Sequence, residues 1–77
     1  MTDSLRLKSL LTLKGLSQGD LAKHLGLSMP TVSMKINNKR AFKLHEILKI
    51  CKFLNINNFQ ECFAIFFGND VDLRLHE

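Results

Sequence analysis

The sequence lacks any apolar run long enough to cross a membrane, and it has no hydrophobic signal-peptide core near its beginning. A membrane-spanning helix needs about 20 mostly apolar residues, whereas the start of this chain mixes charged residues with leucine. Linkers, internal repeats and low-complexity tracts are also absent. These absences argue against a membrane protein and a small secreted protein held together by disulfides. The length of 77 residues fits one small domain rather than a large enzyme.

Cysteine is scarce, because Cys51 and Cys62 are the only two and they lack CxxC spacing. Apolar residues flank both, so we interpret them as small buried hydrophobic side chains that stay reduced in a cytoplasmic protein. A metal site formed with His45 would need a ligand spacing that the sequence does not contain. The sequence also has no nucleophile motif and no glycine-rich phosphate loop. We therefore predict no metal, no cofactor and no enzyme activity.

Acidic residues are few in the first part of the chain. Residues 1–54 contain ten basic and three acidic residues, a net charge of +7, whereas residues 55–77 contain one and four, a net charge of −3. A basic body with an acidic end is typical of a protein whose body binds a polyanion. An ordinary solvated surface would give the same count. Charge alone leaves both interpretations open.

Apolar residues at spacings of three and four predict a helix over residues 3–14, which Gly15 ends. Ser17 opens a second helix, because Asp20 follows three positions later as in a capping box. Gly26 ends that second helix. It is too short to be stable alone, so it must pack on its neighbours.

A third helix is predicted to begin after Ser28, another N-cap residue, with Pro30 in its first turn, where a missing N–H costs nothing. Val32 and Ile36 are four positions apart and are expected to face the core. Residues 37–40 are predicted to form a loop, because asparagine tolerates left-handed geometry and no apolar residue anchors the stretch.

Two further helices are predicted after residue 42. Apolar spacing marks the fourth, and Asn57 with Gln60 resembles a capping box that opens the fifth. The positions expected to face the core are Leu44, Ile47, Leu48, Cys51 and Leu54 in the fourth helix, and Phe59, Cys62, Phe63 and Phe66 in the fifth.

The end of the chain changes to a period of two. Val71, Leu73 and Leu75 alternate with polar residues, which is typical of a half-buried strand. We therefore expect a mainly α fold of five short helices with a C-terminal β-strand. A hairpin whose first arm is residues 63–67 is the close alternative.

The two short helices on either side of Gly26-Leu27-Ser28 have the arrangement of a helix-turn-helix. Residues 16–28, LSQGDLAKHLGLS, resemble the core of the lambdoid repressor and Cro (XRE-type) helix-turn-helix family, whose pattern LSQ-x-x-LA-x-x-LG-LS they share. The resemblance continues through residues 31–33 and 36–40 and covers residues 5–56. It implies the phage-repressor type of fold and a DNA-binding transcription regulator, a phage or prophage repressor or a Cro-like protein.

In this family the helix beginning at Ser28 lies in the DNA major groove, and the N-terminus of the preceding helix touches phosphate. Ser17 and Gln18 occupy that N-terminus, where free N–H groups and the helix dipole favour an anion. Lys39 and Arg40 are expected to hold the DNA backbone on the far side. The residues that the resemblance implies for DNA binding are Ser17, Gln18, Ser28, Met29, Pro30, Thr31, Ser33, Met34, Lys35, Asn37, Asn38, Lys39 and Arg40.

The front of the third helix departs from the family pattern. Met29, Pro30 and Met34 stand where the family commonly has residues that hydrogen-bond to purine edges. Met29 and Pro30 are expected to contact thymine methyl groups, and Lys35 to reach a guanine or a phosphate. DNA shape would then supply more of the specificity. Because methionine is adaptable at interfaces, the alternative is an antirepressor that keeps the fold but docks onto a repressor.

We expect one domain over residues 1–77, with its core in residues 5–56 and a C-terminal tail over residues 57–77 that serves dimerisation. A single module makes few base contacts, so a homodimer is expected on a double-stranded DNA operator. The expected location is the bacterial host cytoplasm, in association with the nucleoid. The alternative protein partner is another regulator protein. The candidate dimer-interface residues are Val71, Leu73 and Leu75.

Overall fold

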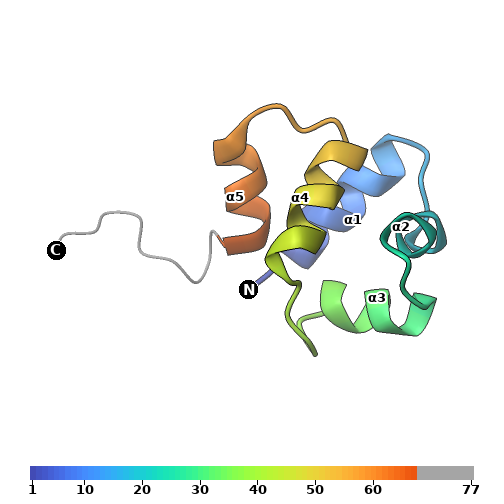
Figure 1. Cartoon of the computed structure of the whole chain (residues 1–77). Helices are drawn as coiled ribbons and strands as arrows, with labels where there is room; N and C mark the ends of the chain where they lie inside the picture. Colours follow the sequence, from blue (N-terminus) through green and yellow to red (C-terminus); the bar gives the residue numbers. More distant parts are fainter. Residues whose placement is uncertain (68–77) are drawn as a thin grey trace, which may run out of the picture.

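The structure, a computed structural model, describes residues 1–67 and contains five α-helices there (Figure 1). They are α1 (Ser4–Leu13), α2 (Gln18–Leu25), α3 (Met29–Ile36), α4 (Leu44–Phe53) and α5 (Phe59–Phe67). α2 packs against both α3 and α4, and α5 packs against α1. No helix in the described part of the chain is both long and apolar enough to span a membrane.

The starts of α2 and α3 carry the caps that the sequence predicts. Ser17 Oγ accepts the N–H of Asp20 at 3.0 Å, and Asp20 Oδ2 accepts the N–H of Ser17 at 2.8 Å, which completes the capping box. Ser28 Oγ accepts the N–H of Thr31 at 3.3 Å, with Pro30 in the first turn of α3. Both predicted helix starts are therefore confirmed.

The first four helices end in one common motif. Just beyond the end of each helix, one residue has a positive φ. The N–H of the residue after it donates to the carbonyl five residues earlier, as in a Schellman motif. The positive-φ residues are Gly15, Gly26, Asn38 and Asn55. The residues that follow them are Leu16, Leu27, Lys39 and Ile56. Three of these are apolar and pack against the core, whereas Lys39 is exposed.

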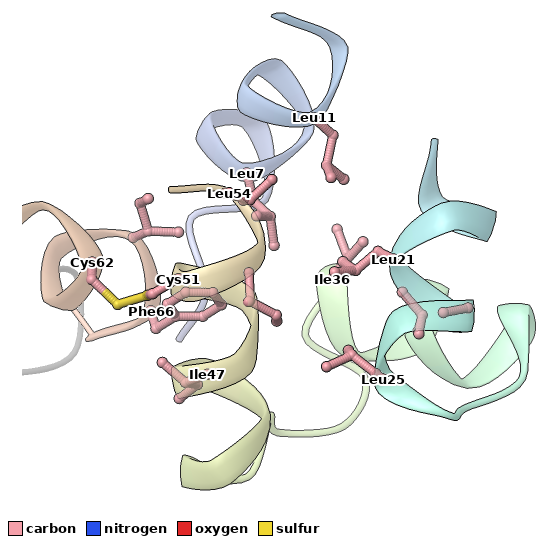
Figure 2. Packing of buried hydrophobic residues seen from close by; sticks show 14 residues of the cluster. Leu7, Leu11, Leu21, Leu25, Ile36, Ile47, Cys51, Leu54, Cys62 and Phe66 are labelled. Carbon is pink, nitrogen blue, oxygen red and sulfur yellow. A yellow bond between two sulfur atoms is a disulfide. The ribbon is translucent and has the colours of Figure 1, made fainter. Parts of the chain in front are cut away.

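The core draws on all five helices (Figure 2). Its fully buried side chains are Leu7, Leu21, Val32, Ile36, Ile50, Leu54 and Ile65. The predicted inward stripe of α4 is partly wrong, because Leu44 and Leu48 are 66% and 58% exposed. Two neighbouring stripes fit the spacing of α4, and the helix is turned so that it buries Ile47 and Ile50. In α5, Phe59 is likewise exposed, and Ile65 fills the core.

A disulfide joins Cys51 of α4 to Cys62 of α5 (Figure 2), with a Cα–Cα distance of 6.2 Å. This corrects the interpretation of the two cysteines as reduced side chains. Both are buried as expected, but no local pattern indicates that α4 and α5 bring Cys51 and Cys62 together. The disulfide links the last two helices.

The described part of the chain contradicts the predicted fold class, which combined helices with a C-terminal strand or hairpin. Over residues 1–67 the structure contains helices and no strand, and residues 63–67, the first arm of the proposed hairpin, form the end of α5. The alternating segment Val71 to Leu75 lies outside the described residues. The predicted cap at Asn57 is also displaced by one residue, because Asn58 Oδ1 accepts the N–H of Gln60 at 2.8 Å.

Candidate nucleic-acid interface

The N-terminus of α2 presents a polar edge to solvent. Ser17 is exposed and Gln18 is half-buried. Hydrogen bonding from the Ser17 backbone N–H lowers the pKa of Asp20 below its usual value, so this carboxylate stays ionised beside the helix start. The remaining first-turn N–H groups point outward along the positive end of the helix dipole, which suits a phosphate oxygen.

The start of α3 lies beside the start of α2. A Cβ placed on Gly19 would stand 3.8 Å from the Sδ atom of Met29, so the first turns of the two helices are neighbours. Pro30 is exposed next to Met29, which is 57% exposed, and Met34 is 38% exposed one turn further on. The outer face of α3 is therefore largely apolar.

Polar side chains at and near the ends of α3 already form hydrogen bonds within the protein. Ser28 Oγ donates to Thr31 Oγ1 at 2.8 Å. Asn37 Nδ2 donates to the carbonyl of Ser33 at 2.9 Å, while Asn37 Oδ1 accepts from Lys8 Nζ at 3.0 Å. Thr31 and Ser33 are half-buried. A base contact by these side chains would have to share or exchange bonds that already exist, which limits direct reading of purine edges.

Lys8 is a cation at this face that the sequence analysis did not single out. It lines a surface hollow together with Ser17 and Gln18, and it bonds to Asn37 at the end of α3. Lys8, a residue of α1, therefore bonds to the end of α3 and lines the same hollow as the start of α2. Periodicity gave no signal for it, because a lysine on the polar side of an amphipathic helix is ordinary.

Lys39 and Arg40 follow α3 directly and are exposed. The carbonyl of Met34 accepts both of their backbone N–H groups, at 2.8 Å and 3.4 Å. Their main chain is thereby fixed to the last turn of α3, and both residues are exposed. Two adjacent cations on a held backbone suit contacts to phosphate.

Lys35 does not belong to this surface. Its side chain is 3% exposed, and its Nζ donates to Glu46 Oε1 at 2.6 Å. This placement contradicts the predicted contact of Lys35 with guanine or phosphate, because the ammonium points into the protein toward a carboxylate. Position 35 lies on the same side of α3 as Val32 and Ile36, and all three are buried.

The other predicted contact residues are accessible. Those classed as exposed are Ser17, Ser28, Met29, Pro30, Met34, Asn37, Asn38, Lys39 and Arg40, and those half-buried are Gln18, Thr31 and Ser33. The α2 start, the outer face of α3 and the loop after it form one surface, which we call the α3 face. The candidate dimer residues Val71, Leu73 and Leu75 lie outside the described residues.

Other ionisable groups offer little further chemistry. The His24 ring is stacked on Phe53 with centroids 4.3 Å apart, on the side of α2 that packs against α4. Within residues 1–67 no three side chains of His, Cys, Asp or Glu come together in a way that would hold a metal ion. The α3 face is thus the place where accessible cations, helix ends and an outward helix coincide.

Comparison with known families agrees with this geometry. A family model described as the Cro/C1-type HTH DNA-binding domain matches residues 6–63. The match spans the whole α3 face and continues into α5. No curated protein and no solved structure gives a significant match to the chain.

Proposed function

The chain belongs to the Cro/C1-type helix-turn-helix DNA-binding family, and we propose that it is a sequence-specific transcription regulator of the phage repressor or Cro type. In this proposal α3 enters the major groove of double-stranded DNA. Ser17 and Gln18 at the α2 start meet phosphate on one side of the groove, and Lys39 with Arg40 meets phosphate on the other.

The observation that carries the proposal is the exposed Lys39-Arg40 pair on a backbone that is hydrogen-bonded to the last turn of α3. Cations fixed relative to the recognition helix set its register on the duplex. Lys8, bonded to Asn37, adds a further positive charge at the same end of α3. Lys35 is instead paired with Glu46 inside the protein, so Lys39 and Arg40 rather than Lys35 are available to a ligand.

Sequence reading by α3 is proposed to rely on apolar contacts and DNA shape. Met29 and Pro30 suit thymine methyl groups, and Thr31 and Ser33 supply the polar contacts. Both ends of the Asn37 amide already form hydrogen bonds within the protein, to Lys8 and Ser33. We therefore propose that Asn37 positions these residues and does not hydrogen-bond to an adenine. Deformability of the operator then contributes to specificity.

We propose that the protein acts as a homodimer through its C-terminal tail, with Val71, Leu73 and Leu75 as the apolar contact. A dimer places two recognition helices on half-sites about one helical turn apart. The net charge of −3 over residues 55–77 suits a position away from DNA.

A second candidate function is that of an antirepressor. The exposure of Met29 and Met34 favours it, because adaptable methionine side chains on a helix face suit a protein partner. The net charge of +7 over residues 1–54 favours DNA instead, since a basic surface would repel the basic face of a repressor.

Selection of bound sites from random duplex DNA tests the proposal. A regulator of this type should enrich a pseudo-palindromic site, and its affinity for that site should fall steeply as salt is raised. Enrichment of no site, together with binding to a helix-turn-helix repressor, would support the antirepressor and overturn the DNA-binding proposal.

A further inference from the structure

The side chain of Asn38 is paired with the main chain of Thr2. Asn38 Oδ1 accepts the N–H of Thr2 at 2.8 Å, and Asn38 Nδ2 donates to the carbonyl of Thr2 at 2.9 Å. Nδ2 also lies 3.4 Å from Ser4 Oγ, which in turn donates to the carbonyl of Ile36. One carboxamide therefore joins the beginning of the chain to the end of α3.

The turn at Asn38 differs from the other three Schellman turns in what holds it. At Leu16, Leu27 and Ile56 the residue after the positive-φ position is apolar and packs on the core, which is the usual anchor of this motif. After Asn38 comes Lys39, which is exposed. The pairing with Thr2 takes the place of the missing apolar anchor.

We propose that Asn38 is a positioning residue, whose pairing with Thr2 holds Lys39 and Arg40 where they contact DNA phosphate. The proposal rests on the function proposed above and deepens it. Asn38 acts through its two neighbours in the chain, because both ends of its amide are occupied within the protein. It differs in this from a residue that binds phosphate directly.

Residues 2–3, which pair with Asn38 or adjoin that pairing, are fixed by burial and by hydrogen bonds to other parts of the protein. Thr2 is 7% exposed. The N–H of Asp3 donates to the carbonyl of Ile65 in α5 at 2.6 Å, and the Asp3 carboxylate caps α1 by accepting the N–H of Arg6. The loop that carries Lys39 is thus fastened to a segment fixed at α1 and α5. Pre-ordering of the loop lowers the entropy lost when the cations bind.

The sequence supplies a matched control for this residue. Asn55 occupies the equivalent position at the end of α4, with a φ of 59° against 64° for Asn38. Its side chain makes no hydrogen bond within the described part of the chain, and the following Ile56 packs on the core. Glycine is tolerated at both φ values, so Asn38→Gly and Asn55→Gly remove the same side chain from the same backbone geometry.

The experiment measures affinity for the selected DNA site in a double-mutant cycle. Asn38→Gly is expected to weaken binding about three- to tenfold, the value of one or two hydrogen bonds, and Asn55→Gly is expected to leave it unchanged. In a Lys39→Ala/Arg40→Ala background, Asn38→Gly should have no further effect. Circular dichroism melts of each variant identify any loss that comes from unfolding.

Two results would overturn the inference. One is an Asn38→Gly variant that binds like the wild type. The other is an equal loss in both backgrounds, which would mean that Asn38 contacts DNA independently or acts on overall stability. If the wild type enriches no DNA site, the proposed function is wrong, and the role of Asn38 in DNA binding is then wrong as well. That outcome is distinct from the other two, because it is seen in the wild type alone.

Discussion

Lys35 Nζ lies 2.6 Å from Glu46 Oε1, and both side chains are almost completely buried. The same Glu46 oxygen accepts the backbone N–H of Lys43 at 2.8 Å. This carboxylate therefore joins the last turn of α3 to the first turn of α4, on both sides of the loop that carries Lys39 and Arg40. The pair connects the packing of α3 to the geometry of the α3 face.

Breaking this pair from one side should be costly. Lys35→Met leaves the Glu46 carboxylate buried without its cation, and we expect the free energy of unfolding to fall by about 3 kcal/mol. Adding Glu46→Gln should recover a large part of that loss, because the amide oxygen still accepts the Lys43 N–H. The chain has no Trp or Tyr, so urea denaturation is followed by far-ultraviolet circular dichroism. A double variant no more stable than Lys35→Met would contradict this account.

The same pair makes stability depend on pH. Burial works to raise the pKa of Glu46, but the hydrogen bonds from Lys35 and the Lys43 N–H, with the charge of Lys35, outweigh it and lower the pKa below 4.5. A lowered folded pKa stabilises the protein above the ordinary pKa, and this stabilisation is lost as pH falls through the folded value. Melting temperatures between about pH 7 and about pH 2 should therefore decline less in the Lys35→Met/Glu46→Gln variant. Parallel declines in the two proteins would show that Glu46 contributes nothing to acid sensitivity.

Reduction of the disulfide between Cys51 and Cys62 should destabilise the domain. The bond closes a loop with a sequence separation of 11, and its loss is expected to cost roughly 2–3 kcal/mol, or about 10 °C in melting temperature for a domain of this size. Melts with and without a dithiol reductant measure the effect. The Cys51→Ala/Cys62→Ala variant is the control and should not respond. An unchanged wild-type melt under reductant would show that the disulfide adds no stability.

Much of the first half of the fold could be predicted because its signals are local. Ser17 with Asp20 and Ser28 with Pro30 define helix starts through bonds within one turn. Gly26 defines an end through its positive φ. The residues proposed to bind DNA come from the resemblance around these same positions and stay a prediction. Each of these features depends on a few neighbouring positions, which a single sequence displays.

The features that were missed depend on distant residues. From the sequence we expected Lys35 to contact DNA, but its side chain pairs with Glu46 inside the protein. Asn38 was expected in a loop that binds DNA, and no local pattern indicates that its side chain pairs with the main chain of Thr2. The disulfide needed the relative placement of two helices. The strand pattern at the end of the chain led us to a strand or hairpin, yet residues 63–67 satisfy a helical period that runs from Phe59. Short apolar runs fit either period.

The proposed dimer contact is tested by Leu73→Asp. A charge at this apolar position should dissociate the dimer, because a carboxylate buried in an apolar contact has no partner. Sedimentation equilibrium of the variant and the wild type at equal concentration measures the change. Asp72→Asn changes the neighbouring residue without adding a charge to the apolar positions and should remain dimeric. A Leu73→Asp protein that sediments as a dimer would show that the contact lies elsewhere.

The salt dependence of operator binding tests the central claim, that the α3 face is the DNA-binding surface, most directly. Two variants remove the same charge from different places. Lys39→Ala/Arg40→Ala removes two cations from the α3 face, and Lys49→Ala/Lys52→Ala removes two that line a separate hollow with His24 and Phe53. The first variant should lower affinity strongly and reduce the slope of log affinity against log salt by about 1.8, the value of two phosphate contacts. The second should keep the wild-type slope. Equal losses in both variants, or no loss in the first, would contradict the account.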